Sequence, residues 1–234
     1  MVPPAQPGFS RSTEDYLKTI YELELAGGAA QTSAIAEALE VAPPSVSGMV
    51  KRLSESGLLE HAPYRGVQLT RSGKRAALRI VRRHRILETY LMSKLGYDWD
   101  SVHGEAERLE HAVSDELIER MAMALGNPQY DPHGAPIPTK DGDVEEPETV
   151  ALSNVSVGAV AELRIVKDRN PDVLRYLASL GLRPGVLFEV VGRQPFRGPI
   201  TIRVQSHARK EAEKVIGNEL AQSLHCILAE EAVG

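Results

Sequence analysis

Residues 35–60 read IAEALEVAPPSVSGMVKRLSESGLLE, and this stretch decides the fold of the N-terminal part of the chain. A short helix that begins near Thr32 runs into a turn followed by two prolines, of which Pro44 suits the first turn of the next helix. That helix presents one apolar face and stops at Gly57. Leu58–Glu60 then begins an extended segment.

The flanking residues complete this pattern on both sides. Residues 12–26 have the apolar spacing of a helix, and residues 67–70, VQLT, return as a strand after the loop APYRG (62–66). Helix, helix, turn, helix and hairpin form a winged helix-turn-helix. Such domains bind DNA, and some serve instead as protein-interaction modules.

Downstream, His103, Glu107, Glu110 and His111 follow the pattern H-x3-E-x2-E-H. We expect one helix over about 102–125, which would place these four side chains within an arc of about 100°. His84-x3-Glu88 repeats the one-turn spacing on a helix expected over 72–95. Nitrogen and oxygen donors at this spacing suit a divalent transition metal.

The alternative is a solvated surface, which is the usual reading of Glu and His on one helix face. The same stripe, however, continues as Ser114, Ile118, Met121 and Leu125, and a solvent-facing stripe would stay polar. Carboxylates in a partly buried place need a partner, and a cation is one.

The C-terminal part has a different pattern. Residues 126–149 are rich in Pro, Gly and acidic residues and are interpreted as a linker. Beyond them we expect a small β-barrel. Its strands are VAELRIV (160–166), VLFEVVG (186–192), ITIRVQ (200–205) and CILAE (226–230), with helices near 172–179 and 208–223.

Charge separates the two parts of the chain. Residues 1–85 hold twelve Lys/Arg and eight Asp/Glu, a net of +4, so the remainder carries -9 of the total of -5. A basic N-terminal part is the charge distribution expected of a DNA-binding surface. The alternative is a helix whose basic residues are paired with acidic neighbours elsewhere in the chain. The chain has no apolar run of about 18 residues and only one cysteine, Cys226, so we expect no membrane span, no disulfide and a cytoplasmic location.

Several motifs resemble the diphtheria toxin repressor family of metal-dependent bacterial regulators. They are TEDYLKTIYEL (13–23), IAEALEVAPPSVSGMVKRL (35–53), SGLLE (56–60), RRHRILE (82–88), VHGEAERLEHAVSDE (102–116) and DPHGAPIP (131–138). The resemblance implies a mostly α N-terminal part and a small C-terminal SH3-like β-barrel. The expected domains are a winged helix-turn-helix (1–74), a helical metal-binding and dimerisation domain (75–138), a linker (139–152) and an SH3-like domain (153–234).

The family resemblance also implies two metal sites. The primary site would use Asp15, Glu107, Glu110 and His111. The ancillary site would use His84, Glu88 and His103, completed by a group from the barrel. Asp168 and Asp172 both flank the loop KDRNPD (167–172), and Asp168 is the predicted ligand. For Asp15 the alternative is a helix cap, since it lies three residues after Ser12. The remaining histidines, His61, His133, His207 and His225, are expected to be ordinary, and Cys226 is expected in the core.

Two of these positions differ from the iron-responsive members of the family. Asp15 stands where they carry Met, and Glu107 stands where they carry Cys. Oxygen-rich ligation favours Mn²⁺ relative to softer ions, so Mn²⁺ is the expected cofactor. Fe²⁺ is the alternative, and other divalent transition metals are expected to substitute in vitro.

The expected function is a Mn²⁺-activated repressor of metal-uptake genes that binds palindromic double-stranded DNA as a homodimer, with no membrane partner and no small-molecule substrate. The DNA contacts would come from Pro44, Ser45, Ser47 and Lys51 in the recognition helix and from Arg65 in the wing. The alternatives are a metalloenzyme with a carboxylate–histidine centre and a metal-independent interaction module. No nucleophile, catalytic base or Gly-rich phosphate loop stands out, so we expect no enzyme.

Overall fold

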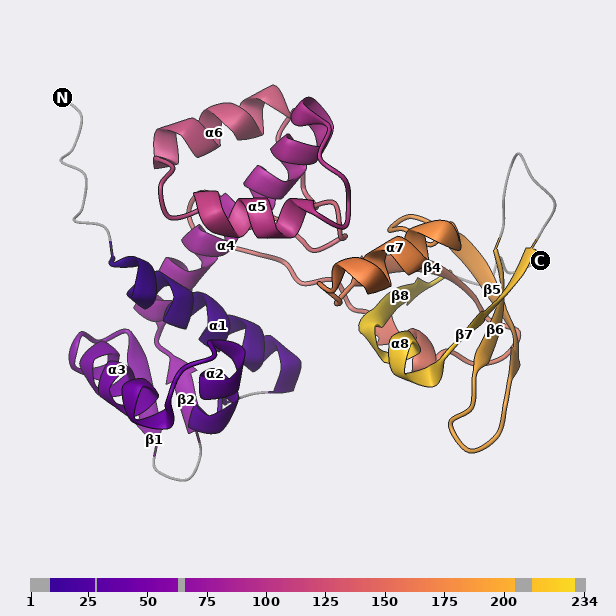
Figure 1. Ribbon diagram of the computed structural model, residues 1–234, viewed down its shortest axis with the longest axis horizontal. Helices are drawn as coiled ribbons and strands as arrows, with labels where there is room; N and C mark the ends of the chain where they lie inside the picture. Colours follow the sequence, from indigo (N-terminus) through magenta and orange to yellow (C-terminus); the bar gives the residue numbers. More distant parts are fainter. Residues whose placement is uncertain (1–8, 28, 63–65, 205–211, 230–234) are drawn as a thin grey trace. The chain divides into compact units, whose positions relative to one another are not determined.

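The computed structural model of the chain describes residues 9–27, 29–62, 66–204 and 212–229 (Figure 1). The chain divides into two compact units. The first comprises Met1–His84, Glu107–Arg120 and Pro138–Val144, and the second comprises Arg85–Ala106, Met121–Ile137 and Glu145–Gly234. Across the described residues, no helix combines the length and the apolar character that crossing a bilayer requires.

The first unit confirms the predicted order of the winged helix-turn-helix. Its elements are α1 (Arg11–Gly27), α2 (Thr32–Ala38), α3 (Pro43–Glu55), β1 (Leu59–Ala62), β2 (Gly66–Leu69) and the N-terminal part of α4 (Arg71–Leu95). β1 and β2 pair antiparallel from Leu59 opposite Leu69 to Ala62 opposite Gly66. α3 begins at Pro43, so Pro44 lies in its first turn, as predicted, because proline is compatible with this position.

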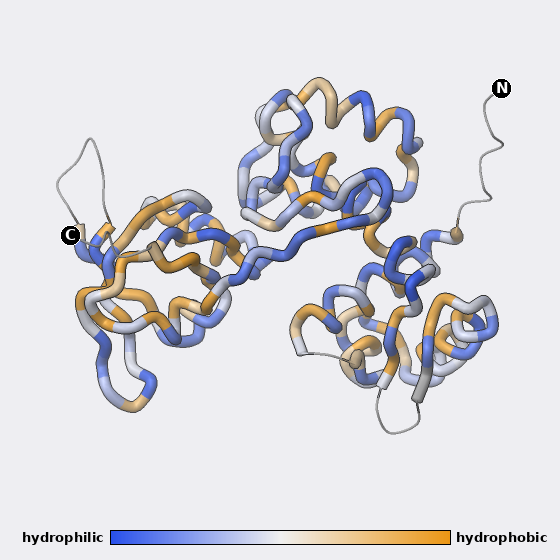
Figure 2. The backbone as a smooth tube through the Cα atoms, turned by 180° about the vertical axis from the view of Figure 1, so that it is seen from behind, coloured by the Kyte–Doolittle hydropathy of each residue, from blue (hydrophilic) through white to orange (hydrophobic). Residues whose placement is uncertain are grey.

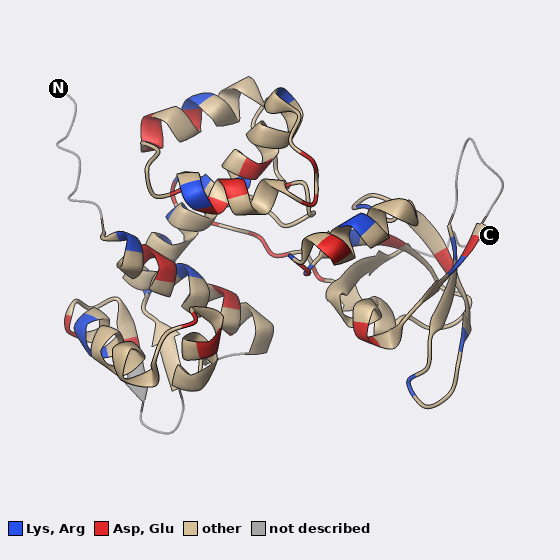
Figure 3. Ribbon diagram, in the orientation of Figure 1, with Lys and Arg blue, Asp and Glu red and all other residues tan. Residues whose placement is uncertain are grey.

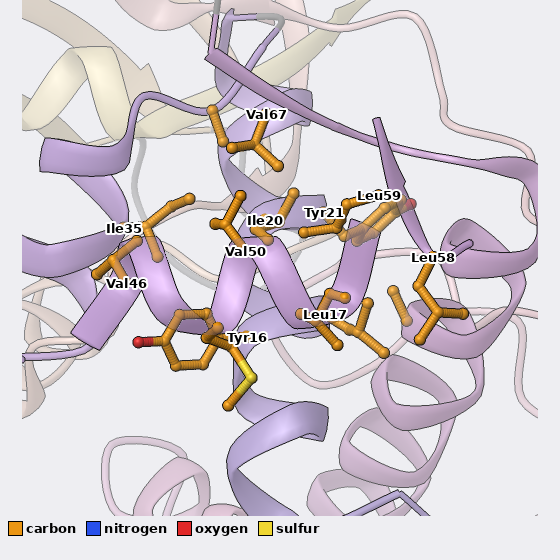
Figure 4. Close-up of a cluster of buried hydrophobic side chains, with 14 of the residues drawn as sticks. Tyr16, Leu17, Ile20, Tyr21, Ile35, Val46, Val50, Leu58, Leu59 and Val67 are labelled. Atoms are coloured by element: carbon orange, nitrogen blue, oxygen red, sulfur yellow. The ribbon is translucent and has the colours of Figure 1, made fainter. Parts of the chain in front are cut away.

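An apolar core holds this winged unit together (Figure 4). Leu17 and Ile20 of α1, Ile35 of α2 and Val46 of α3 are fully buried in it, as is Val67 of β2. The wing also packs closely on α4. A Cβ added at Gly73 would lie 2.0 Å from the Leu58 carbonyl oxygen, so only glycine allows this approach.

The single helix expected over 102–125 is wrong, because two helices occupy this range. α5 spans Val102–Leu109 and α6 spans Asp115–Ala124. The Leu109 carbonyl accepts from the Ala112 amide at 2.9 Å, which closes α5. Ser114 Oγ then accepts from the Leu117 amide at 3.2 Å and caps the new helix. The Ser114 cap therefore starts a second helix, although the helical spacing of the stripe continues through both helices.

The second unit contains a six-stranded antiparallel sheet of order β3-β8-β4-β5-β6-β7, which confirms the predicted small β domain. Its elements are β3 (Val150–Ala151), η1 (Leu152–Asn154), β4 (Val160–Val166), α7 (Pro171–Ser179), β5 (Leu187–Arg193), β6 (Ile200–Val204), β7 (Ala212–Ile216), α8 (Asn218–Ser223) and β8 (Leu224–Leu228). Apolar residues recur along these strands (Figure 2).

The helix expected over 208–223 is mostly wrong. Residues 212–216 form β7, whose Ala212 pairs with Val204 and whose Ile216 pairs with Ile200 of β6. Pairing along a whole neighbouring strand outweighs the helical propensity of this charged segment. Only α8 is helical among the described residues of the range.

The core of the second unit includes Trp99 as well as residues of the sheet. The Trp99 indole donates from Nε1 to the Pro132 carbonyl oxygen at 3.0 Å. Cys226 is fully buried in this core, as expected, and its burial raises the pKa of the thiol to about 12.

Candidate metal centre and nucleic-acid interface

The first unit brings Asp15, Glu110 and His111 together. One ligand atom from each lies within 4.8 Å of the others. Asp15 comes from α1, whereas Glu110 and His111 lie in the turn that follows α5. Three of the four predicted primary ligands therefore converge, although they are distant in sequence.

The orientation of the His111 ring favours a metal ligand. Its Nδ1 lies 2.7 Å from Glu14 Oε2, and because a carboxylate oxygen accepts, Nδ1 is the donor. Nε2 then carries the lone pair. It lies 2.8 Å from Asp15 Oδ1 and 3.4 Å from Glu110 Oε1, but neither contact is aligned as a hydrogen bond, so this buried nitrogen has no hydrogen-bond partner. An orphaned imidazole nitrogen facing two carboxylates fits a divalent cation.

Glu14 is itself fixed by a charged neighbour. Its Oε1 accepts from Arg83 of α4 at 3.0 Å, and Arg83 also bonds Asp115 at 3.0 Å. Burial alone would lower the pKa of Arg83, and the carboxylates of Asp115 and Glu14 outweigh it, so its pKa is raised. Neither Glu14 nor Arg83 was among the residues predicted from the sequence to contribute to this site. Position next to Asp15 was the only signal that could have pointed to Glu14.

Asp15 is a ligand candidate and not a helix cap in this structure. Ser10 Oγ accepts from the Thr13 amide at 3.3 Å, so Ser10 caps α1, and Ser12 lies inside the helix. Burial has the largest effect on the Asp15 carboxyl and raises its pKa, and the negative charge of Glu110 adds to the rise. Burial therefore makes the ionised form of Asp15 less favourable than it is in water, and a bound cation would offset this effect.

Lys18 is the unexpected member of this region. Its ammonium donates to Glu107 Oε1 at 2.6 Å and to both oxygens of Glu110 at 2.9 and 3.0 Å, and it lies 3.3 Å from His84 Nδ1. Burial lowers the pKa of Lys18, but the charges of Glu110 and Glu107 outweigh this effect, and the pKa is raised. Lys18 is thus a buried cation among predicted metal ligands.

The four predicted primary ligands are therefore arranged in two overlapping groups. Glu107 lies with His84 and Glu110 around Lys18, whereas Asp15 lies with His111 and Glu110. His84 Nδ1 is 2.6 Å from Glu110 Oε2, and His84 precedes Glu88 by one turn of α4.

The second unit holds another cluster, around Glu88. His103 Nδ1 lies 2.9 Å from Glu88 Oε1, and His133 Nδ1 lies 3.9 Å from Glu88 Oε2. Glu88, Asp131 and His133 each offer a ligand atom within 4.8 Å of the others. Burial raises the pKa of Asp131, and the charge of Glu88 raises it further.

His133, expected to be ordinary, is a ligand candidate here. Its Nε2 lies 3.2 Å from the Trp99 carbonyl oxygen, which can only accept, so Nε2 carries a hydrogen, and Nδ1 is the ring nitrogen that faces Glu88. The ring also stacks on Trp99 with centroids 5.4 Å apart. Asp131 Oδ1 accepts from the amides of His133 and Ala135, which shapes the turn.

Asp168 has a different local role. Its Oδ1 accepts from the Asn170 amide at 2.9 Å, in the loop before α7, and among the described residues it joins no group of potential metal ligands. Asp168 was predicted as a metal ligand from its position in a loop. The ligand candidates near Glu88 are instead Asp131 and His133, which lie in a turn within the stretch expected to be a linker.

α3 presents a polar face suited to DNA. Pro44, Ser45, Ser47 and Lys51 are all exposed, while Val46, Met49, Val50 and Leu53 face the core. Figure 3 shows the basic segment of α3 in blue. A Cβ added at Gly48 would meet nothing within 4 Å, so this face is open. Arg65 lies outside the described residues. Exposed basic residues also follow β2, at Arg71, Lys74, Arg75 and Arg79.

Known families match along almost the whole chain. Residues 8–67 match the model described as the iron dependent repressor N-terminal DNA binding domain, residues 70–139 match the iron dependent repressor metal binding and dimerisation domain, and residues 150–225 match the FeoA domain.

Individual proteins agree with these matches. The chain is 35% identical over 224 residues to the diphtheria toxin repressor of Corynebacterium diphtheriae, which covers 91% of this chain and 95% of that protein. It is 42% identical over 127 residues to the iron-dependent repressor IdeR of Mycobacterium leprae, over 54% of this chain and 55% of that protein, so it spans about half the length of this relative. A solved manganese-dependent transcriptional repressor in complex with manganese is similar at a TM-score of 0.84 and 40% identity, over 93% of this chain and 100% of that one.

Proposed function

Because the chain belongs to the diphtheria toxin repressor family, we propose that it represses transcription when Mn²⁺ occupies the cluster around Asp15, Glu110 and His111. The family consists of DNA-binding metal-dependent repressors and not of enzymes, so the metalloenzyme alternative falls away. The observation that carries the proposal is the buried His111 Nε2, which faces two carboxylates and has no hydrogen-bond partner.

The donor chemistry favours manganese. The cluster supplies carboxylate oxygens and an imidazole nitrogen, and the described residues place no sulfur ligand in any of the candidate groups. Oxygen-rich sets suit Mn²⁺ better than softer metals. The similarity to a manganese-dependent repressor supports this choice. Fe²⁺ is the second candidate, because the IdeR relative is described as iron-dependent.

The arrangement explains how metal and DNA binding would be linked. A bound cation would supply the positive charge that holds Asp15 of α1 against Glu110 and His111. α1 also carries core residues that pack against α2 and α3, including Leu17 and Ile20. Fixing α1 would therefore stabilise the recognition helix in one position. Coupling of this kind typically contributes about 1–3 kcal/mol.

On DNA, α3 would enter the major groove through the exposed Pro44, Ser45 and Ser47, with Lys51 near the backbone. The metal binding and dimerisation match supports a homodimer, and a twofold dimer would read a palindrome.

Fluorescence anisotropy on one labelled candidate palindrome tests this function. Wild-type protein would be titrated with Mn²⁺, Fe²⁺, Zn²⁺ and Co²⁺, next to His111→Ala and, as a surface control, Glu116→Gln. We expect DNA affinity to rise most with Mn²⁺ in wild type and in the control, and to be metal-independent in His111→Ala. Equal DNA affinity with and without every metal in wild type would refute the proposal, and a larger response to Fe²⁺ would select the second candidate.

A further inference from the structure

The ammonium of Lys18 lies where a second metal ion would be expected. His84, Glu107 and Glu110 each offer a ligand atom within 4.8 Å of the others, which is the geometry of a cation site. Lys18 Nζ is close to all three, at 2.6 Å from Glu107 Oε1, 2.9 Å from Glu110 Oε1 and 3.3 Å from His84 Nδ1. The residue is only 5% exposed.

This position adjoins the proposed metal cluster through one shared carboxylate. Glu110 Oε1 lies 2.9 Å from Lys18 Nζ and 3.4 Å from His111 Nε2, while Glu110 Oε2 lies 2.6 Å from His84 Nδ1. Glu110 is fully buried, so water does not compete for its carboxylate oxygens at either position. Two-metal centres in general hold two cations about 3.5–4 Å apart, and Glu110 is the carboxylate shared by the two positions here.

The charges of the region agree with one metal ion and one ammonium. Asp15, Glu107 and Glu110 carry three negative charges when ionised. Lys18 supplies one positive charge, and one divalent ion supplies two, which together balance these three carboxylates. A second divalent ion would add net positive charge and would have to approach an ammonium, which donates only and cannot act as a ligand.

We propose that Lys18 is a built-in cation that fills the second of two adjacent positions and thereby restricts this cluster to one divalent metal ion per chain. The inference rests on the proposed function, since it concerns the same metal cluster. It assigns Lys18 a role in setting the number of metal ions. A merely structural ion pair would leave this number unchanged when the residue is replaced.

The direct test is to exchange the ammonium for a ligand. Lys18→Glu reverses the charge and adds a carboxylate beside His84 and Glu107, and it balances two divalent ions against four carboxylates. Lys18→Arg is the matched control, because it retains the positive charge. Both changes would be made in the full chain carrying Glu88→Gln and His133→Ala, so that the second cluster does not contribute to the count.

Mn²⁺ bound per chain would be measured by equilibrium dialysis, and electron paramagnetic resonance would distinguish isolated ions from a spin-coupled pair. We expect one uncoupled ion with Lys18 and with Lys18→Arg, and two coupled ions with Lys18→Glu. One ion in Lys18→Glu, or a coupled pair with Lys18 present, would overturn the inference.

Failure of the proposed function would look different. If the protein with Lys18 binds no Mn²⁺, the proposed metal site is refuted, and the inference is refuted with it. Circular dichroism would verify folding of each variant. If Lys18→Glu does not fold, Lys18→Gln decides the matter, because a second ion in that variant supports the inference and a single ion contradicts it.

Discussion

His111 Nδ1 donates to Glu14 Oε2 at 2.7 Å, and this hydrogen bond directs the opposite nitrogen of the ring toward Asp15. Hydrogen bonds of this kind select the imidazole tautomer and raise its basicity as a ligand. The primary cluster therefore depends on a residue that is not itself a metal-ligand candidate.

Glu14→Gln should lower Mn²⁺ affinity by about 10- to 100-fold, because the amide accepts more weakly and no longer fixes the ring. Isothermal titration calorimetry would measure the dissociation constant. Glu116→Gln, at an exposed ion pair with Arg120, is the control and should leave affinity unchanged. Unaltered affinity in Glu14→Gln would show that Glu14 does not orient His111.

Asp15→Asn should act in opposite directions with and without metal. Burial raises the pKa of Asp15, so its ionised form costs stability in the metal-free protein at neutral pH. We expect the melting temperature of the metal-free variant to exceed that of wild type. With free Mn²⁺ at about 100 times the dissociation constant, wild type should gain about 2.7 kcal/mol and the variant much less. Differential scanning calorimetry would detect both changes, and a lower metal-free melting temperature would contradict the first.

The pH dependence follows from the same carboxyl. A raised folded pKa means that the folded state retains a proton at a pH where the unfolded state has lost it. The stability penalty is therefore present above the folded pKa and disappears as pH falls through it. Mn²⁺ must displace this proton, so its apparent affinity should fall from neutral toward acidic pH.

Calorimetry in two buffers of different ionisation enthalpy would count the protons that Mn²⁺ releases in the acidic range. Fewer should be released by Asp15→Asn than by wild type. Equal release from both proteins would assign the proton to another group, such as His111 or Glu110.

The second cluster allows a choice between His133 and Asp168. His133→Ala should remove one bound metal ion per chain or strongly weaken it, because its Nδ1 faces Glu88. Asp168→Asn should retain both ions, since its carboxylate bonds the Asn170 amide. Equilibrium dialysis with Mn²⁺ would count the ions. Loss of an ion in Asp168→Asn but not in His133→Ala would identify Asp168 as the ligand, as predicted from the sequence.

Lys51→Ala should weaken DNA binding similarly for all sequences. Each phosphate contact contributes about 0.9 to the slope of log affinity against log salt, so the slope should decrease by about this amount per chain. Anisotropy at several salt concentrations measures it, with the exposed Lys140→Ala as control. An unchanged slope in Lys51→Ala would place this residue away from the phosphates.

Much of the fold is accessible from local sequence patterns. The winged helix-turn-helix follows from the prolines before α3, its apolar face and the alternating strands. The patterns fail where a stronger interaction competes. Ser114 caps a new helix inside a continuous apolar stripe, and β6 recruits residues 212–216 into the sheet despite their helical composition.

By itself, the sequence determined the order of elements in the winged helix-turn-helix and indicated the kinds of candidate metal ligand, because helical and strand periodicities and turn residues act between near neighbours. Only the tertiary structure decided which atoms meet. Lys18 and Glu107 are 89 positions apart, and His111 and Glu14 are 97 apart. These contacts form when packing brings α1 against the turn after α5, so the orientation of His111 and the position of the Lys18 ammonium depend on burial and charge in three dimensions.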